Sequence, residues 1–293
     1  MPLATTGDLV GRAAAARSAV TAFNVITLEH IEAVVAGAES VRSPVVLQVS
    51  ENAVKYRYGR LLPLARAAVA AAEAAAVPVA LHLDHVQSDS LLRQAPDAGF
   101  SSVMYDASGL PYAENLAATR AAADWAHAQG LWIEAELGEV GGKTGPDGRG
   151  RAAAPLDAHA PGARTRPADA RAFVADSGVD ALAVAVGSSH AMTTRTAALD
   201  HDLLKELSAA LEVPLVLHGS SGVPDDELTA AVAGGIAKVN VGTALNLAMT
   251  GAIREYLAAR PDAADSRGYL TAGREAMVRT VASIIRVVAP TAS

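Results

Sequence analysis

The chain repeats one pattern along most of its length: a short apolar run, a polar residue at its end, and a stretch with helical spacing. Eight apolar runs occur, at residues 20–23, 45–49, 79–83, 102–105, 131–135, 181–186, 214–217 and 237–241. Helical spacing follows at 28–38, 60–75, 88–98, 112–129, 167–176, 201–210 and 225–233, and two further helices are predicted at 244–259 and 273–288. Apolar strands that alternate with helices are typical of a parallel sheet covered on both faces.

Eight strand–helix units favour a closed barrel over an open sheet. The 293 residues, of which 51% are hydrophobic, suffice for the core of one large domain. We therefore predict an α/β fold, a (β/α)8 TIM barrel with extra C-terminal helices, as a single domain over residues 1–293. One connection is unusually long and rich in glycine and proline, at residues 137–166. Loops of this length often act as lids, so we predict a mobile active-site flap there.

Composition narrows the possible functions. The chain has no cysteine, so a transition-metal site must use histidine, aspartate or glutamate. Its formal charge of −7, without a basic cluster, argues against nucleic acid as a partner. No secretory signal is evident in residues 1–10, and the alanine-rich segment 65–76 is too short and too charged to span a bilayer. We expect a cytoplasmic protein that does not bind membranes.

Polar residues stand where each predicted strand ends, and in a TIM barrel those ends carry the active site. In chain order they are Asn24, Ser50, Asp84 with His85, Asp106, Glu136, His190, His218 and Asn240. Three of the chain's eight histidines are among them. Three neutral imidazoles around one ion, with a position left open, form a catalytic zinc site. We predict His85, His190 and His218 as zinc ligands, with Asp84 as an acid–base group beside them.

Other interpretations of these residues stay open. Asp84 could instead cap the next helix, and the histidines could merely hydrogen-bond loop backbone. Asp106 and Glu136 could support the ligands, bind a metal themselves or anchor loops. His82 lies within a strand and is predicted to be packed there. The remaining histidines are predicted to be solvated: His30, His127, His159 and His201.

Small residues after the seventh and eighth strands predict a phosphate-binding cradle. They are Gly219, Ser220 and Ser221 in one turn, and Asn240, Val241, Gly242 and Thr243 in the next. Such residues let backbone N–H groups approach an anion, and these two loops often bind phosphate in barrels, helped by a following helix N-terminus.

Taken together, these motifs resemble the class II, zinc-dependent ketose-bisphosphate aldolases, which include fructose- and tagatose-bisphosphate aldolases. The resemblance covers nearly the whole chain. It is carried by AFNV at 22–25, LHLDH at 81–85, VMYD at 103–106, EAELGEVGG at 134–142, LAVAVG at 182–187, LHGSSG at 217–222 and KVNV at 238–241.

The resemblance implies reversible cleavage of a ketose (bis)phosphate to dihydroxyacetone phosphate and an aldehyde such as glyceraldehyde 3-phosphate. It assigns zinc to His85, His190 and His218, secondary metal positions to Asp106 and Glu136, and the proton of the C4 hydroxyl to Asp84. Substrate contacts fall on Asn24, Ser50 and Asn240, and the dihydroxyacetone phosphate cradle on Gly219, Ser220, Ser221 and residues 240–243. Arg267 matches an arginine that grips the far phosphate, often across a subunit boundary. A homodimer or homotetramer, and a monovalent cation (Na⁺ or K⁺), are also implied.

Two positions depart from the family pattern. The family has a flap glutamate that removes a proton from the ketone; this chain has Thr144 at that position, and Asp147 is the nearest carboxylate. In the family, the residue after the second zinc histidine is a glycine that contributes to the phosphate and cation site; here that residue is Ala191. Two alternatives therefore stay open: an aldolase for a different sugar phosphate, and a non-catalytic zinc- and phosphate-binding companion subunit. Another barrel phosphosugar enzyme, such as an isomerase, would not need three histidines at these strand ends.

Overall fold

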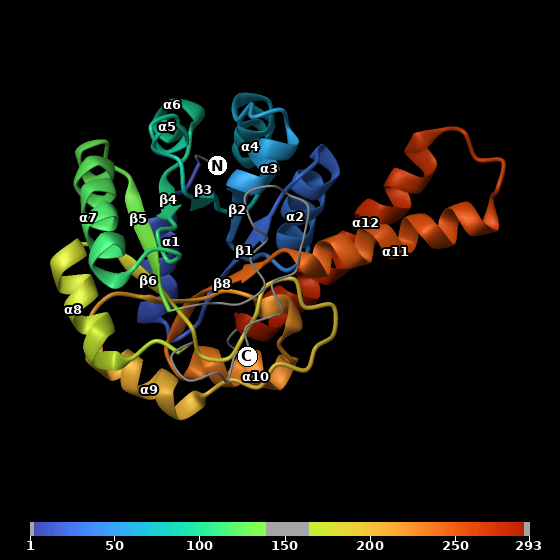
Figure 1. The fold of residues 1–293 in the computed structure, drawn as a ribbon. Coiled ribbons are helices and arrows are strands. Elements are labelled where there is room, and N and C mark those ends of the chain that lie inside the picture. Colours follow the sequence, from blue (N-terminus) through green and yellow to red (C-terminus); the bar gives the residue numbers. More distant parts are fainter. Residues whose placement is uncertain (1–2, 139–163, 290–293) are drawn as a thin grey trace.

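The computed structural model describes residues 3–138 and 164–289. Eight parallel strands form a closed barrel in which each strand pairs with its neighbour in sequence and β1 pairs with β8. This confirms the predicted TIM barrel (Figure 1). The strands are β1 (Val20–Asn24), β2 (Val45–Ser50), β3 (Val79–Val86), β4 (Ser102–Tyr105), β5 (Trp132–Leu137), β6 (Ala181–Val184), β7 (Leu215–Leu217) and β8 (Ile236–Val241).

The helices surround the barrel, and nearly all of the predicted ones are present. They are α1 (Thr6–Ala15), α2 (Leu28–Ser40), α3 (Glu51–Tyr56), α4 (Leu62–Ala74), α5 (Asp89–Leu92), α6 (Ala95–Ala98), α7 (Tyr112–Ala128), α8 (Pro167–Ser177), α9 (His201–Ala210), α10 (Asp225–Ala233), α11 (Thr243–Ala259) and α12 (Ser266–Val288), with a 3-10 turn at Ser220–Gly222. The predicted helix at 88–98 is divided into α5 and α6. Pro96, in the first turn of α6, has no N–H to donate, so one continuous helix cannot form.

Alternation along each strand separates two kinds of core. Side chains that point outward, such as Leu47 on β2 and Leu81 on β3, pack under the helices in one large apolar cluster. Inside the barrel the lowest layer holds small residues such as Ala22 and Ala80, which pack against α1. Helix α1 was not predicted, although Thr5 caps it and Leu9, Val10 and Ala13 form its apolar face. It closes the amino-terminal end, so the opposite end carries the site.

Helices α11 and α12 form a hairpin that projects from the barrel (Figure 1). Only Leu245 of α11 is buried, whereas Leu247 and Leu257 are exposed. Helix α12 is longer than predicted, because the side chain of Asp265 accepts a hydrogen bond from the backbone N–H of Arg267 and caps an additional first turn. Within the described part of the chain, no helix combines the length and the apolar character that crossing a membrane would require.

Candidate active site

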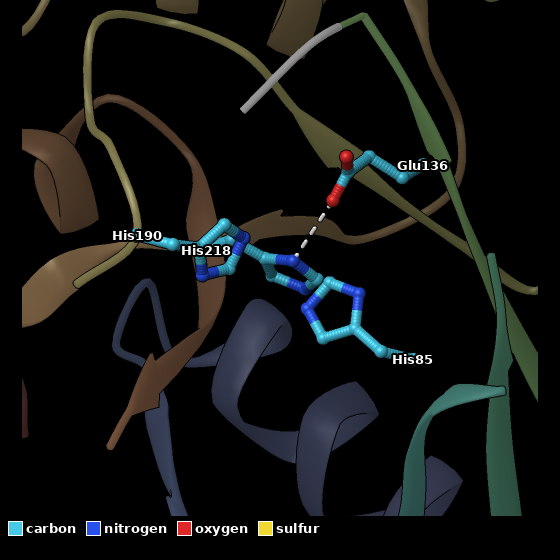
Figure 2. A group of neighbouring side chains, drawn as sticks. All are labelled: His85, Glu136, His190 and His218. Carbon is cyan, nitrogen blue, oxygen red and sulfur yellow. Dashed lines mark ion pairs between the residues drawn. The ribbon is translucent and has the colours of Figure 1, made fainter. Parts of the chain in front are cut away.

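Three histidine rings meet at the carboxyl end of the barrel: His85 lies at the end of β3, His190 follows β6 and His218 follows β7. The ring centroids of His85 and His190 lie 5.1 Å apart, those of His85 and His218 4.9 Å, and those of His190 and His218 5.7 Å. Glu136 joins them, and the four side chains each offer one ligand atom within 4.8 Å of the others (Figure 2). The sequence predicted these histidines as one cluster, and the fold brings them together.

His85 is oriented by a carboxylate behind it. Its Nδ1 lies 2.8 Å from Oδ2 of Asp106, whose other oxygen accepts bonds from the backbone N–H and hydroxyl of Ser108. Since a carboxylate accepts, Nδ1 carries the proton and Nε2 is available to a metal. His85 also has a φ of +49°, a left-handed conformation that is costly for a side chain with a Cβ. Strain of this kind is frequently found at functional sites.

His218 is completely buried and is held from two sides. Its Nε2 lies 2.8 Å from Oε1 of Glu134, and its Nδ1 lies 3.0 Å from Oε2 of Glu136. Burial lowers the pKa of His218, but the hydrogen bonds to Glu134 and Glu136 outweigh it and raise this pKa to about 9. Without a metal the ring is therefore protonated at neutral pH, and a cation binding at Nδ1 has to displace one proton.

A fully buried charge pair lies beneath the histidines. Nζ of Lys238 on β8 is 2.8 Å from Oε2 of Glu134 on β5. Burial raises the pKa of Glu134, but Lys238 and His218 lower this pKa by more than burial raises it, so the side chain stays a carboxylate. His82, beside the pair, is held neutral because burial and the charge of Lys238 lower its pKa to about 3. His82 is packed as predicted, with its Nδ1 2.7 Å from Oγ of Ser102.

Asp84 is held by a relay of amide side chains. Gln48 donates to Oδ1 of Asn24 at 2.9 Å, and Nδ2 of Asn24 donates to Oδ2 of Asp84 at 2.9 Å. Burial raises the pKa of Asp84, but the neighbouring His85 and His218 lower it overall, so the group is ionised. Its Oδ1 has no hydrogen-bond partner among the described residues. Asp84 thus presents one bonded and one open oxygen beside the histidine cluster.

A pocket of about 540 Å³ opens above the histidines, and most of the predicted site residues line it. These are Asn24, Ser50, Asp84, His85, His190, Ala191, Gly219, Ser220, Ser221, Asn240, Gly242 and Thr243. Asp106, Glu136 and the completely buried His218 are not in the lining: Asp106 stands behind His85, and Glu136 lies against Nδ1 of His218 within the cluster. Val241 is buried in the apolar core, and Arg267 lies near the start of α12 with an 89% exposed side chain paired to Asp265. Thr144, Asp147 and most of the predicted flap lie outside the described residues.

A family model described as fructose-bisphosphate aldolase class II matches residues 4–291. The chain belongs to the class II fructose-bisphosphate aldolase family. The curated fructose-bisphosphate aldolase of Giardia intestinalis is 36% identical to it over 303 residues, covering 94% of this chain and 90% of the relative. The protein is thus an aldolase, as the motifs predicted, from a family that binds phosphorylated sugars and generally uses zinc.

Two solved structures are similar to this aldolase over almost its whole length. The YdjI aldolase from Escherichia coli K12 is 29% identical, with a TM-score of 0.81 and coverage of 98% of this chain and 97% of that one. A candidate fructose-1,6-bisphosphate aldolase from Coccidioides immitis is 30% identical, with a TM-score of 0.82 and coverage of 97% and 95%.

The pocket of the aldolase also has side chains in its lining that the sequence did not single out. Asn52, Tyr56 and Asn246 line the pocket, and His30 holds Asn246. His30 was predicted to be solvated, and this was wrong. The residue is 3% exposed, with Nδ1 3.0 Å from Oγ1 of Thr27 and Nε2 3.2 Å from Oδ1 of Asn246. The histidine lies on α2, and its contact with Asn246 of α11, far away in the sequence, could not be read from the helical pattern. His127 is exposed as predicted, His201 is half-buried against Glu227, and His159 is outside the described residues.

The turn after β7 depends on glycine at position 219. Gly219 has a φ of +67°, and a Cβ there would lie 2.6 Å from the backbone C and O of Ser189. The matched control is Gly178, which has a φ of +73° but no atom within 4 Å of the position that an alanine Cβ would occupy. Gly178→Ala should cost roughly 1–2 kcal/mol of stability from backbone strain alone.

Gly219→Ala should cost about 1–3 kcal/mol more than Gly178→Ala, because the backbone of Ser189 cannot yield without a shift of the loop that carries His190. It should also raise KM for the phosphorylated sugar, whereas the control should not. Denaturant unfolding and steady-state kinetics measure both effects. Equal losses in the two variants would contradict the close approach between Gly219 and Ser189.

Proposed function

We propose that the protein is a zinc-dependent aldolase that reversibly cleaves a ketose (bis)phosphate to dihydroxyacetone phosphate and an aldehyde such as glyceraldehyde 3-phosphate. The observation that carries this proposal is the convergence of His85, His190 and the buried His218, next to a pocket that His85, His190 and the Asp84 carboxylate line. The family and the 36% identical fructose-bisphosphate aldolase support the reaction class.

The donor set fits zinc. Three imidazoles with room for a substrate oxygen form the usual catalytic arrangement for this ion. Two of the rings have a carboxylate on their outer nitrogen, Asp106 for His85 and Glu134 for His218, which selects the tautomer that can bind a metal. When bound, zinc supplies a Lewis acid that polarises the ketone and stabilises the charge developing as the carbon–carbon bond breaks. Asp106 and Glu136 are proposed as nearby secondary positions.

Asp84 is proposed as the base for cleavage. Its open Oδ1 takes the proton of the C4 hydroxyl as the bond between C3 and C4 breaks and the aldehyde forms, and it returns that proton in the condensation direction. Asn24 keeps the carboxylate in place through its 2.9 Å bond to Oδ2. The proton exchanged at C3 is assigned to the flap, where Asp147 is the proposed carboxylate in place of the family glutamate.

The phosphate of dihydroxyacetone phosphate is proposed to bind between the turn at Gly219–Ser221 and the start of α11. Both line the pocket, and they are joined because the backbone N–H of Ala244 donates to Oγ of Ser221 at 3.1 Å. The N-terminus of a long helix favours an anion through its exposed N–H groups and its dipole. Ser50 and Asn240, which also line the pocket, are proposed to contact the sugar.

The test is retro-aldol cleavage of fructose 1,6-bisphosphate and of tagatose 1,6-bisphosphate, with zinc present and after chelation. We expect chelator-sensitive cleavage of at least one of them, restored when zinc is added back. Absence of cleavage by protein that holds one zinc per chain would overturn this substrate assignment and favour another sugar phosphate or a companion role. Cleavage that survives complete removal of metal would overturn the zinc chemistry.

The single-domain organisation and the cytoplasmic location stay predictions from length, pattern and composition. The homodimer or homotetramer and the monovalent cation stay predictions from the family resemblance. Arg267 lies in the first turn of α12 and is not among the residues that line the pocket. Because the hairpin of α11 and α12 projects from the barrel (Figure 1), the proposed role of Arg267 at the far phosphate is assigned to the pocket of a second subunit. The exposed Leu247 and Leu257 on the same hairpin support such an assembly.

A further inference from the structure

Lys238 is the only lysine among the fully buried side chains of the described residues, and it lies inside the barrel below the proposed zinc site. A buried ammonium group is stable only where it is paired and hydrogen-bonded. Lys238 donates to Oε2 of Glu134 at 2.8 Å and to Oδ1 of Asn240 at 2.8 Å. An ammonium group has donors and no acceptor, so both of its partners must present an oxygen to it.

The first consequence concerns Asn240. Its Oδ1 is turned toward Lys238, so its Nδ2 amino group is turned away from the lysine. Asn240 lines the pocket, and Nδ2 has no hydrogen-bond partner among the described residues. Lys238 therefore leaves a donor, and not an acceptor, unpaired on the side of the amide that is turned away from the lysine.

The second consequence concerns His218. Oε2 of Glu134 is engaged by Lys238, and Oε1 lies 2.8 Å from Nε2 of His218. A carboxylate in this position accepts a hydrogen bond from Nε2, so the lone pair of Nδ1 is left for a metal. Nδ1 points into the cluster, where it lies 3.0 Å from Oε2 of Glu136 (Figure 2). The ammonium group of Lys238 on β8 thus orients Glu134 on β5, and Glu134 in turn sets the tautomer of His218, which follows β7.

We propose that Lys238 is a positioning residue that sets the hydrogen-bonding polarity of two site residues. Through Glu134 it keeps the imidazole proton of His218 on Nε2 and leaves Nδ1 free for the metal, and directly it turns the amino group of Asn240 away from itself and toward the substrate. The first part rests on the proposed zinc site. A purely structural role, in which Lys238 only neutralises Glu134, predicts different behaviour when both residues are changed.

Glu134→Gln separates the two roles. While Lys238 is present, the amide oxygen of the new side chain must face the ammonium group, so its amino group faces Nε2 of His218. That donor forces the imidazole proton onto Nδ1, where it blocks the metal. In the double variant Glu134→Gln with Lys238→Met, the amide is free to reverse and to present its oxygen to His218. Its amino group then faces the neutral His82, whose Nε2 lies 3.9 Å from Oε2 of Glu134 in the native chain.

Zinc affinity is measured by competition with a chromophoric chelator, and folding by thermal unfolding in the chelator. We expect Glu134→Gln to weaken zinc binding by about 10–100-fold, the range for loss of a partner of a metal-bound histidine. The double variant should recover to within about twofold of Lys238→Met, since the two changes no longer conflict. The double variant should nevertheless keep a raised KM for the sugar phosphate, because Lys238 no longer holds the amide oxygen of Asn240. Additive losses of affinity, or a KM that recovers together with zinc binding, would overturn the proposal.

The test does not depend on the single variant Glu134→Gln, which leaves an unpaired buried lysine. In the Lys238→Met background, Glu134→Gln should bind zinc within about twofold of its parent. Glu134→Ala, which offers no acceptor to His218, should bind at least about tenfold more weakly. Equal affinities would overturn the role of the acceptor. A wild-type chain that binds zinc but cleaves neither bisphosphate would refute the proposed substrates and leave the zinc comparison valid.

Discussion

Asp84→Asn should lower kcat for retro-aldol cleavage by about 10²–10⁴-fold, the usual contribution of a positioned acid–base group, while zinc content stays at the wild-type level. Asparagine has the same shape, and its oxygen can still accept from Nδ2 of Asn24 in place of the carboxylate oxygen, at 2.9 Å in the native chain. What it lacks is a basic oxygen at the open Oδ1 position. The variant therefore separates loss of proton transfer from loss of structure.

The measurement for Asp84→Asn is kcat on the sugar bisphosphate that the wild-type protein cleaves, together with zinc per chain by atomic absorption. Asp124→Asn, an exposed aspartate on α7, is the matched control and should change neither quantity. More than about one tenth of wild-type kcat in Asp84→Asn would contradict the role of general base, because the expected loss begins at about a hundredfold.

His218→Ala should lose both zinc and activity. It removes one of three imidazoles and also leaves Glu134 and Glu136, two buried carboxylates, without the ring that lies 2.8 Å and 3.0 Å from them. The loss of zinc affinity should exceed the 10–100-fold that accompanies loss of an outer partner alone, so we expect at least about a hundredfold. Loss of the imidazole partner from both buried carboxylates should also lower the melting temperature of the metal-free protein.

His82→Asn is the control for His218→Ala. His82 is equally buried, and its Nε2 lies 3.9 Å from Oε2 of Glu134, yet it is not a member of the cluster of potential metal ligands. It should lower stability through its lost packing and its bond to Ser102, while the protein still holds one zinc per chain. Zinc per chain after dialysis and the melting temperature in a chelator measure both variants. A folded His218→Ala protein with full zinc content would exclude this residue as a ligand.

The strands could be predicted well because they are buried on both faces and therefore appear as short apolar runs bounded by polar residues. β4 at Ser102–Tyr105 and α9 at His201–Ala210 coincide with the predicted ranges. Errors occurred where local pattern was weak. Helix α1 closes the barrel with only a few apolar residues, and the start of α12 depends on the cap formed by Asp265. Such features are recognised through their contacts more than through their periodicity.

For the candidate site, the sequence sufficed to name residues at strand ends, since a parallel barrel gathers all of those ends on one face. It did not indicate Gln48, Glu134 or Lys238 as part of the site. Each of these interrupts an otherwise apolar strand, which is a detectable signal, but its meaning depends on a partner on another strand. His30 shows the reverse error, because its burial comes from a segment more than two hundred residues away in the chain.

The sequence by itself determined the barrel, the order of its strands and the set of polar groups at its carboxyl end, because apolar periodicity and strand ends are local properties. The tertiary structure alone decided which nitrogens of His85 and His218 are available to a metal, and which oxygen of Asp84 has no hydrogen-bond partner among the described residues. It also decided how Lys238 connects to His218 through Glu134 and to Asn240 directly. These are properties of hydrogen bonds between strands that lie far apart in sequence, and only closure of the barrel brings their side chains within bonding distance.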